Sequence, residues 1–187
     1  PEESLDSLVT TLLALSGLNH ESMLRGMDWM FQEIGRRAER ARLTATLLKY
    51  TLTKPLPSMQ QQQILESVLL SVEALISFRR RYRGRKNIAY GLDLLMSDIT
   101  NPRSLIYQIE LLRKYLDELP HNANQPLGLV PESRQIIKSL NDILLADLEA
   151  LEQIDEESGV RKNLCDLMTQ ITQQIEQFTA LLSDKYF

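Results

Sequence analysis

The stretch Gly35-Arg36-Arg37-Ala38-Glu39-Arg40-Ala41 occupies the middle of a predicted long helix, residues 23–52. At about 100° per residue, one stripe of this helix is apolar. The stripe consists of Met27, Phe31, Ile34, Ala38, Ala41, Ala45 and Leu48. Leu43, Leu47 and Tyr50 form a second apolar surface roughly opposite the first. Because a helix that is apolar on two sides is normally surrounded by other helices, the pattern predicts a helical bundle organised around this segment.

Further helices are predicted from apolar residues at helical spacing and from the Gly, Pro and Asn residues that separate them. Their predicted ranges are 4–16, 58–82, 88–97, 102–119, 131–154 and 160–183. Gly17 is interpreted as the stop of the first, and Asn101 and Pro102 as the start of the helix 102–119. No segment shows the alternation of a strand. The chain is therefore predicted to be all-α, a single helical bundle of about seven helices over residues 1–187.

Three arginines stand where the predicted helices emerge from the core. Arg79 and Arg83 continue the buried stripe of the helix 58–82. Arg103 lies in the first turn of the helix 102–119, where a cation opposes the helix dipole. Arg103 is therefore expected to have an anionic partner. A carboxylate such as Glu39 and a bound ligand both fit that role.

These positions and the central stretch form one predicted Glu-Arg cluster, consisting of Arg36, Glu39, Arg40, Arg79, Arg83 and Arg103. One interpretation is an ion network that locks helices, with Glu39 accepting hydrogen bonds from arginines of the other helices, because a guanidinium pairs a carboxylate through two parallel bonds. A second is a pocket for a phosphate or carboxylate ligand, with Glu39 as a general base. A third is a surface for a protein partner. The three are not exclusive, and the excess of arginine favours an acidic partner.

The net charge of −4 conceals an uneven distribution along the chain. Residues 1–24 carry a net charge of −4, residues 25–103 carry +7 and residues 104–187 carry −7. Such asymmetry indicates a basic working region and an acidic solvated one. The alternative is that the oppositely charged halves attract each other in the folded chain.

Several classes of site are not predicted. His20 and His121 lie far apart, so no metal site is expected, and Gly84 and Gly91 lack phosphate-loop spacing, so no cofactor is expected in this chain. The single Cys165 excludes an internal disulfide and fits a cytoplasmic location. No apolar run is long enough to span a membrane. The isoelectric point of about 5.3 does not favour nucleic-acid binding.

Around the central stretch, the sequence resembles Alpha-E, a bacterial family of uncharacterised helical proteins named for a Glu-Arg motif. The resemblance covers about residues 15–120. It is carried further by Ser22-Met23-Leu24-Arg25-Gly26, Phe78-Arg79-Arg80-Arg81-Tyr82-Arg83, Leu92-Asp93-Leu94-Leu95 and Asn101-Pro102-Arg103-Ser104-Leu105. The family domain is longer than this chain and carries an earlier Glu-Arg-Ala helix. Together with the start at Pro1, this implies that the chain is the C-terminal fragment of a longer protein.

Residues 15–22 look most like family members that are fused behind a circularly permuted ATP-grasp domain. The resemblance implies a non-catalytic helical accessory module in a system that forms peptide or amide bonds with ATP. Its partner would be an ATP-grasp domain, in the same chain or encoded beside it, and the basic surface would bind that partner, an acidic peptide or a phosphate. The alternative is a ligand-binding or catalytic domain in which Glu39 and the arginines hold a phosphate or carboxylate substrate. Whether the full-length protein is an ATP-dependent ligase stays open.

Overall fold

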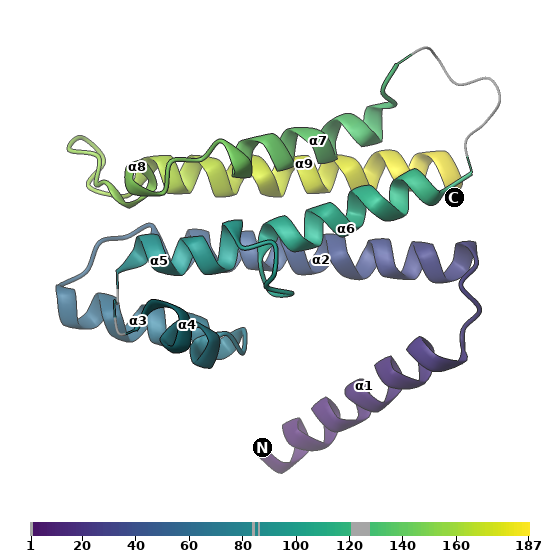
Figure 1. Ribbon diagram of the computed structural model, residues 1–187, viewed down its shortest axis with the longest axis horizontal. Helices are drawn as coiled ribbons and strands as arrows, with labels where there is room; N and C mark the ends of the chain where they lie inside the picture. The colour runs from purple at the N-terminus through teal and green to yellow at the C-terminus, as the bar shows by residue number, and fades with distance from the viewer. Residues whose placement is uncertain (1, 84, 86, 121–127) are drawn as a thin grey trace.

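The computed structural model describes residues 2–83, 85, 87–120 and 128–187. Within these residues the chain forms helices and no strand, which confirms the all-α prediction. The helices of Figure 1 are α1 (Glu2–Ser22), α2 (Met27–Leu52), α3 (Ser58–Ser71), α4 (Leu75–Tyr82), α5 (Ile88–Leu92), the π-helical turn η1 (Asp93–Ser97), α6 (Leu105–Glu118), α7 (Pro131–Leu144), α8 (Leu148–Glu152) and α9 (Lys162–Tyr186). None of these described helices is both long and apolar enough to cross a membrane.

Helix α2 lies at the centre of the bundle, where it packs against α6 and α9. Its predicted inward stripe is confirmed from Ile34 onward, because Ala38, Ala41 and Leu48 are all at most 2% exposed. The alanines allow the neighbouring helices to approach the axis of α2 closely. Helices α2 and α6 form a central layer. Helices α7 and α9 form an antiparallel pair on one side of this layer, and α3 and α4 lie on the other side (Figure 1).

Helix α1 departs from the prediction of a helix that stops at Gly17. It continues to Ser22, and the helical hydrogen bonds persist as far as the bond from the Met23 amide to the Asn19 carbonyl. A glycine ends a helix only where the chain turns into a left-handed conformation, and Gly17 does not do so. The consequence is a long projecting helix that diverges from the bundle, the purple element of Figure 1.

The predicted helix 58–82 is wrong, because the chain breaks between α3 and α4. Glu73 adopts a left-handed conformation with φ of 56°, and the amide of Ala74 donates to the Leu69 carbonyl. A left-handed residue of this kind ends a helix. The side chains that follow it therefore do not point in the directions that one continuous helix would give them. As a result Ile76 is 82% exposed, whereas Ala74 and Phe78 are buried.

The predicted helix start at Asn101 and Pro102 is also wrong. Helix α6 begins at Leu105, and its N-cap is Ser104, whose hydroxyl accepts from the Tyr107 amide at 3.2 Å. The Asn101 side chain instead donates to the Leu94 carbonyl at 2.8 Å and so fastens the preceding turn. A side chain that could cap a helix thus forms its hydrogen bond with the backbone of a preceding segment when the chain turns before the helix begins.

The predicted helix 131–154 is likewise divided, into α7 and α8. Asp147 caps α8, since its carboxylate accepts from the amides of Glu149 and Ala150. The described residues therefore contain nine α-helices where about seven were predicted, because the helices predicted at 58–82 and 131–154 each form two.

Gly91 supports a close approach between α5 and α3, which yields a first prediction. A Cβ atom at Gly91 would lie 2.5 Å from Leu65 Cδ1, and Leu65 is only 1% exposed. Gly91→Ala is expected to lower the free energy of unfolding by about 1–3 kcal/mol, because a buried neighbour must shift. The measurement is equilibrium unfolding in urea. Gly35→Ala in α2 is the control, because a Cβ there meets nothing within 4 Å and the higher helix propensity of Ala should stabilise the chain. Equal stability of the two variants would contradict the close approach.

Candidate functional site

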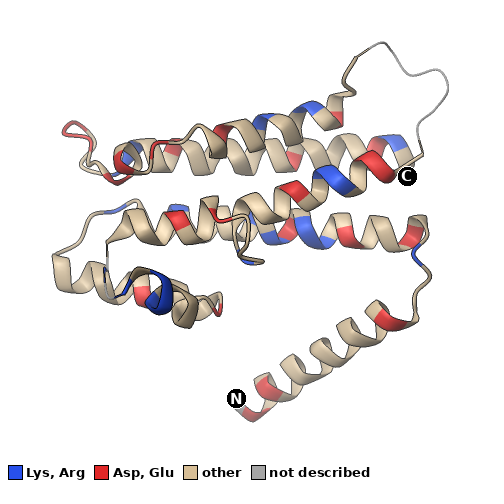
Figure 2. Ribbon diagram, in the orientation of Figure 1, with Lys and Arg blue, Asp and Glu red and all other residues tan. Residues whose placement is uncertain are grey.

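A groove with a volume of about 370 Å³ runs along one face of α2. Helix α2 supplies most of its lining, the end of α3 supplies two residues, and the turn before α6 supplies one. The lining consists of Arg36, Glu39, Arg40, Leu43, Thr44, Leu47, Ser71, Val72 and Arg103. Figure 2 shows this part of α2 as the most densely charged segment of the central layer.

Helical spacing explains why α2 presents these side chains together. Residues separated by three or four positions lie above one another on a helix. Arg36, Arg40, Leu43 and Leu47 follow this spacing, so the arginines lie at one end of the groove and the leucines at the other. The opposite stripe of α2 is buried in the core. The groove is therefore the free side of the central helix, basic at one end and apolar at the other.

Glu39 lines the groove but is paired within its own helix. Arg42 Nε donates to Glu39 Oε2 at 2.9 Å, and Arg42 Nη2 donates to Oε1 at 2.7 Å. These hydrogen bonds lower the pKa of Glu39 below its ordinary value. The prediction that Glu39 joins arginines of other helices is therefore wrong: the pair lies within one turn of α2, and the Glu39 side chain is 55% exposed.

The buried carboxylate of the α2 network is Glu33, six residues before Glu39. Its side chain is 4% exposed and receives Arg36 Nη1 at 2.9 Å and Arg37 Nη2 at 2.8 Å. Arg37 also approaches the amide oxygen of Gln108 on α6 at 3.4 Å. Gln108 in turn donates to the Pro102 carbonyl. Arg37 connects α2 to α6 and to the turn before it, so Glu33 locks the helices indirectly, by holding Arg37 from within α2.

Arg40 is the arginine of the groove without an acidic partner. Among the residues that the structure describes, no carboxylate forms an ion pair with its guanidinium. Burial lowers the pKa of Arg40, and the positive charges of Arg103, Arg37 and Arg36 lower it further, while the charge of Glu33 offsets a smaller part of this shift. A partly buried cation surrounded by other cations has an unfavourable electrostatic energy. An anion in the groove would relieve it.

Arg103 lies across the groove from Arg40 and reaches α3. Its guanidinium forms an ion pair with Glu73, at the left-handed turn that ends α3. The expectation that Arg103 has an anionic partner is thus met by Glu73 and not by Glu39. Because Glu73 is 75% exposed, the pair is solvated and readily exchanged for another anion.

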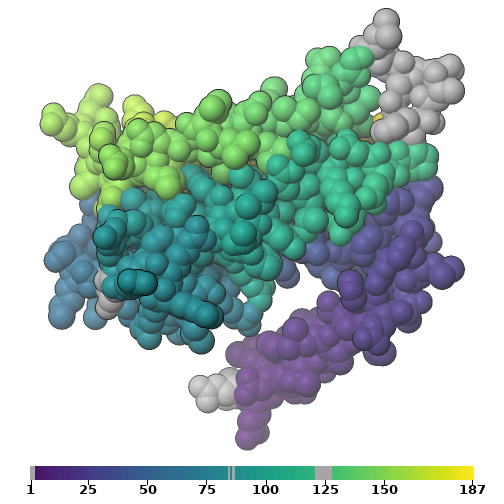
Figure 3. All heavy atoms as spheres, in the orientation of Figure 1, coloured from purple at the N-terminus to yellow at the C-terminus, as the bar shows by residue number. Residues whose placement is uncertain are grey.

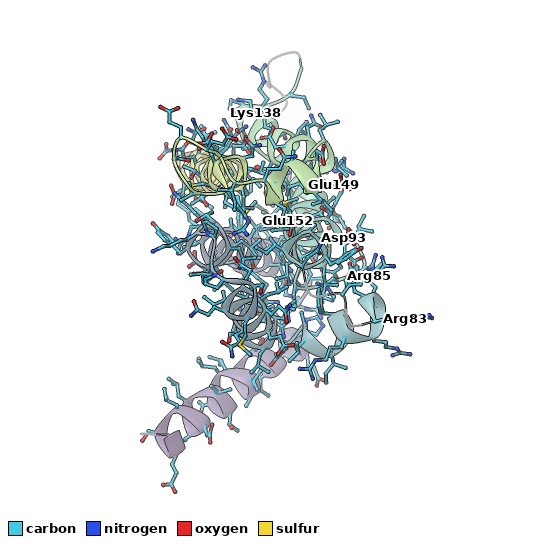
Figure 4. The ribbon with its side chains drawn as sticks, turned by 90° about the vertical axis from the view of Figure 1, so that its left-hand side faces the viewer. Arg83, Arg85, Asp93, Lys138, Glu149 and Glu152 are labelled. Atoms are coloured by element: carbon cyan, nitrogen blue, oxygen red, sulfur yellow. The ribbon has the colours of Figure 1, made fainter. Side chains whose placement is uncertain are left out.

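Arg79 and Arg83, predicted to join this cluster, lie elsewhere. The break at 72–74 turns α4 so that Arg79 is 60% exposed, and its nearest ion-pair partner is Glu66 at 3.7 Å. Arg83 is the left-handed C-cap of α4, with φ of 47°. Figure 4 shows Arg83 at the outer edge of the molecule, pointing away from the bundle. The structure therefore brings Arg36, Glu39, Arg40 and Arg103 together and leaves two predicted residues apart.

A second cluster, of arginine and tyrosine, occupies α4 and α5. Tyr82 and Tyr90 have ring centroids 5.1 Å apart, and Arg81 and Arg85 lie over these rings at 5.6 Å and 5.7 Å. Tyr82 donates to an Asp93 oxygen at 2.5 Å, and burial together with this bond raises the pKa of Tyr82. These contacts fasten α4 to α5, and the residues involved are engaged with one another.

The remaining candidate chemistry is limited. In the described ranges, no group of His, Cys, Asp and Glu residues has the geometry to hold a metal ion. His20, which was predicted to lie in a loop, is part of α1. His121 lies outside the described residues. The groove on α2 is therefore the best-supported site.

Comparisons with known proteins cover nearly the whole chain. A family model called Alpha-E, described as a predicted alpha-helical domain with a conserved ER motif, matches residues 1–187. Glu39-Arg40 is the only Glu-Arg pair in the sequence. Uncharacterized proteins of Mycobacterium bovis and Mycobacterium tuberculosis are 31% identical over 174 residues, covering 92% of this chain. The chain spans only 19% of the length of these relatives. No solved structure matches it.

Proposed function

The chain belongs to the Alpha-E family of helical domains, and on that basis we propose that it is a non-catalytic binding module of a system that forms peptide or amide bonds with an ATP-grasp partner. In this role the groove on α2 holds an acidic, partly apolar peptide segment. The observation that carries the proposal is Arg40, a half-buried guanidinium that has no carboxylate partner among the described residues and is surrounded by other arginines.

The chemistry of the groove favours a peptide over a free phosphate. Arg36, Arg40 and Arg103 present planar guanidinium groups, which pair carboxylates and phosphates equally well. Leu43 and Val72 add an apolar surface beside them, and a bare inorganic anion gains nothing from it. An acidic side chain flanked by aliphatic ones satisfies both ends of the groove.

A binding role also suits the state of Glu39 better than general-base catalysis does. A base that works near neutral pH needs a pKa close to that pH. The two hydrogen bonds from Arg42 lower the pKa of Glu39 and thereby stabilise its ionised form. Glu39 is accordingly a weak base, and its role in the proposal is to limit the negative charge that the groove accepts.

The ATP-grasp association rests on the resemblance of residues 15–22 to fused members of the family. A helical module beside an ATP-grasp domain would position a carboxylate-bearing substrate or dock the partner domain. Both tasks require recognition of carboxylates, which the arginines of the groove provide. The activity of any longer protein that contains this chain is part of the proposal.

Fluorescence anisotropy tests the binding role directly, with a fluorescein-labelled peptide in which leucine and glutamate alternate. The wild-type chain is expected to bind this peptide, with an affinity that falls as salt is added. Arg40→Gln is expected to weaken binding about tenfold, because a charge-assisted hydrogen bond is worth roughly 1.5–3 kcal/mol.

Two controls make the test specific to the groove. Arg113→Gln removes the same charge from an exposed position on α6 outside the groove, and should leave the affinity unchanged. A peptide with glutamine in place of glutamate should bind weakly to every variant. Equal affinity of Arg40→Gln and wild type would overturn the proposal, and displacement of the peptide by millimolar inorganic phosphate would shift it to a phosphate site.

A further inference from the structure

Helix α1 exposes an apolar face that no other described helix covers. Leu5, Leu8, Leu12 and Leu15 follow one another at helical spacing, and each is more than half exposed. Leu13 and Leu18 are 68% and 66% exposed. Figure 3 shows α1 standing off from the body, with open space beside its N-terminal half. A patch of this size marks a contact surface.

The elbow between α1 and α2 holds α1 in this projecting position. The Arg25 side chain donates to the His20 carbonyl at the end of α1. The same guanidinium lies 4.6 Å from the centre of the Trp29 ring on α2. The Gly26 amide also donates to the Leu24 carbonyl at 2.8 Å, which tightens the connection. In this position the apolar face of α1 stays exposed and does not pack on α2.

The charges of α1 complement those of the groove. The helix carries acidic residues, including Glu3 and Asp6, and no Lys or Arg (Figure 2). Asp6 lies at the border of the leucine face, about 100° from Leu5 around the helix. The groove combines the same two properties with opposite charge, since arginines lie beside Leu43 and Val72. Helix α1 thus matches the groove in apolar character and complements it in charge.

We propose that the groove receives helix α1 of a second copy of this chain, in a reciprocal exchange that forms a dimer. The proposal rests on the proposed function and names the partner of that site. With 21 residues, α1 is about 31 Å long, whereas the groove-lining part of α2 from Arg36 to Leu47 spans about 17 Å. One helix therefore covers the whole groove. Because each copy gives and receives one α1, the assembly closes as a two-fold dimer.

Sedimentation equilibrium of the chain of residues 1–187 tests the proposal, and wild type is expected to have the mass of a dimer. Leu12→Glu is expected to weaken the dimer at least tenfold, by placing a carboxylate in the apolar face. The matched control is Ala14→Glu, which adds the same charge on the other side of α1 and should leave the dimer unchanged. On the groove, Leu43→Asp should weaken the dimer similarly, and because Leu43 is 53% exposed the variant should fold.

Mixing the two defective variants distinguishes the proposed contact from other dimers. The Leu12→Glu chain retains an intact groove and the Leu43→Asp chain retains an intact α1, so the mixture should form a one-to-one complex. Pairing of α1 with α1 predicts instead that Leu43→Asp remains a dimer and that the mixture gains nothing. That result, or a wild-type chain that is monomeric at every concentration, would overturn the proposal.

The proposed function is tested separately, with the Leu12→Glu chain. If the groove binds acidic peptides, this variant should bind the labelled peptide more tightly than wild type, because α1 no longer competes. Peptide binding by a chain that never dimerises would leave the proposed function standing and remove only the dimer. If the wild-type chain dimerises but the free groove of the Leu12→Glu chain binds no acidic peptide, the dimer would stand and the proposed peptide-binding function would be wrong.

Discussion

Replacing Glu33 by glutamine is expected to lower the free energy of unfolding by about 3–5 kcal/mol. Glu33 is the buried carboxylate of α2, and both of its oxygens receive an arginine: Arg36 at 2.9 Å and Arg37 at 2.8 Å. Glutamine keeps the shape of the side chain but removes the charge. The Arg37 side chain, 18% exposed, would then keep a mostly desolvated charge with no carboxylate to balance it.

The effect should be large because the network continues into α6. Arg37 approaches Gln108, and Gln108 holds the Pro102 carbonyl. Loss of the carboxylate therefore frees a side chain that positions a second helix and the turn carrying Arg103. For a chain of this size the thermal midpoint should fall by roughly 6–20 °C. Differential scanning calorimetry at neutral pH is the measurement.

Glu39→Gln is the matched control, because it makes the same chemical change six residues further along the same helix. Glu39 is 55% exposed and its partner Arg42 lies on the same helix. An exposed ion pair of this kind is screened by water and contributes little. The thermal midpoint of Glu39→Gln should remain close to wild type. If the two variants lost equal stability, the assignment of the helix-locking role to Glu33 would be wrong.

The sequence predicts α2 well because its core-facing residues are small and apolar over many turns. Ile34, Ala38, Ala41 and Ala45 are buried as the 3.6-residue period requires. Glu33 was missed because charged residues are assigned to the outside by default, and it stands one position from the apolar stripe. The available signal was the spacing of Glu33 to Arg36 and Arg37, which matches i+3 and i+4 ion pairs.

Four of the six predicted cluster residues line one groove because three of them share one continuous helix. Periodicity fixes relative direction only within an uninterrupted helix. Arg79 and Arg83 were projected across residues 72–74, where Glu73 takes a left-handed conformation that no glycine or proline announces. Each irregular residue rotates everything that follows it. The prediction failed at that point and not in its estimate of helix content.

Helix α1 shows a different limit of sequence analysis. Its leucines at helical spacing predict an amphipathic helix, and the structure contains one. Periodicity reveals which face is apolar but not what covers it. In the structure the apolar face of α1 is exposed, and a second copy is proposed as its partner. The apolar face of α9 is covered instead, and its Met168 and Phe178 are fully buried.

Arg161→Ala is expected to lower the free energy of unfolding by about 3 kcal/mol, from the loss of two hydrogen bonds made by a charged donor. Arg161 is 6% exposed and stands immediately before α9. Its Nη1 donates to the Leu52 carbonyl at 3.0 Å, and its Nε donates to the Glu152 carbonyl at 3.1 Å. These carbonyls end α2 and α8, where helices leave backbone acceptors without partners.

Burial lowers the pKa of Arg161, which shows that its charge is disfavoured at this position and is retained for its bonds. The Arg161 amide adds a third link, to the Thr53 carbonyl at 2.8 Å, and this link survives any side-chain change. Arg161→Lys should therefore recover part of the stability, because an ammonium keeps the charge but lacks the fork that reaches two carbonyls. Lys162→Ala, at the exposed neighbouring position, should be neutral. The measurement is urea unfolding. If Lys162→Ala lost as much free energy of unfolding as Arg161→Ala, the ends of α2 and α8 would not depend on the Arg161 side chain.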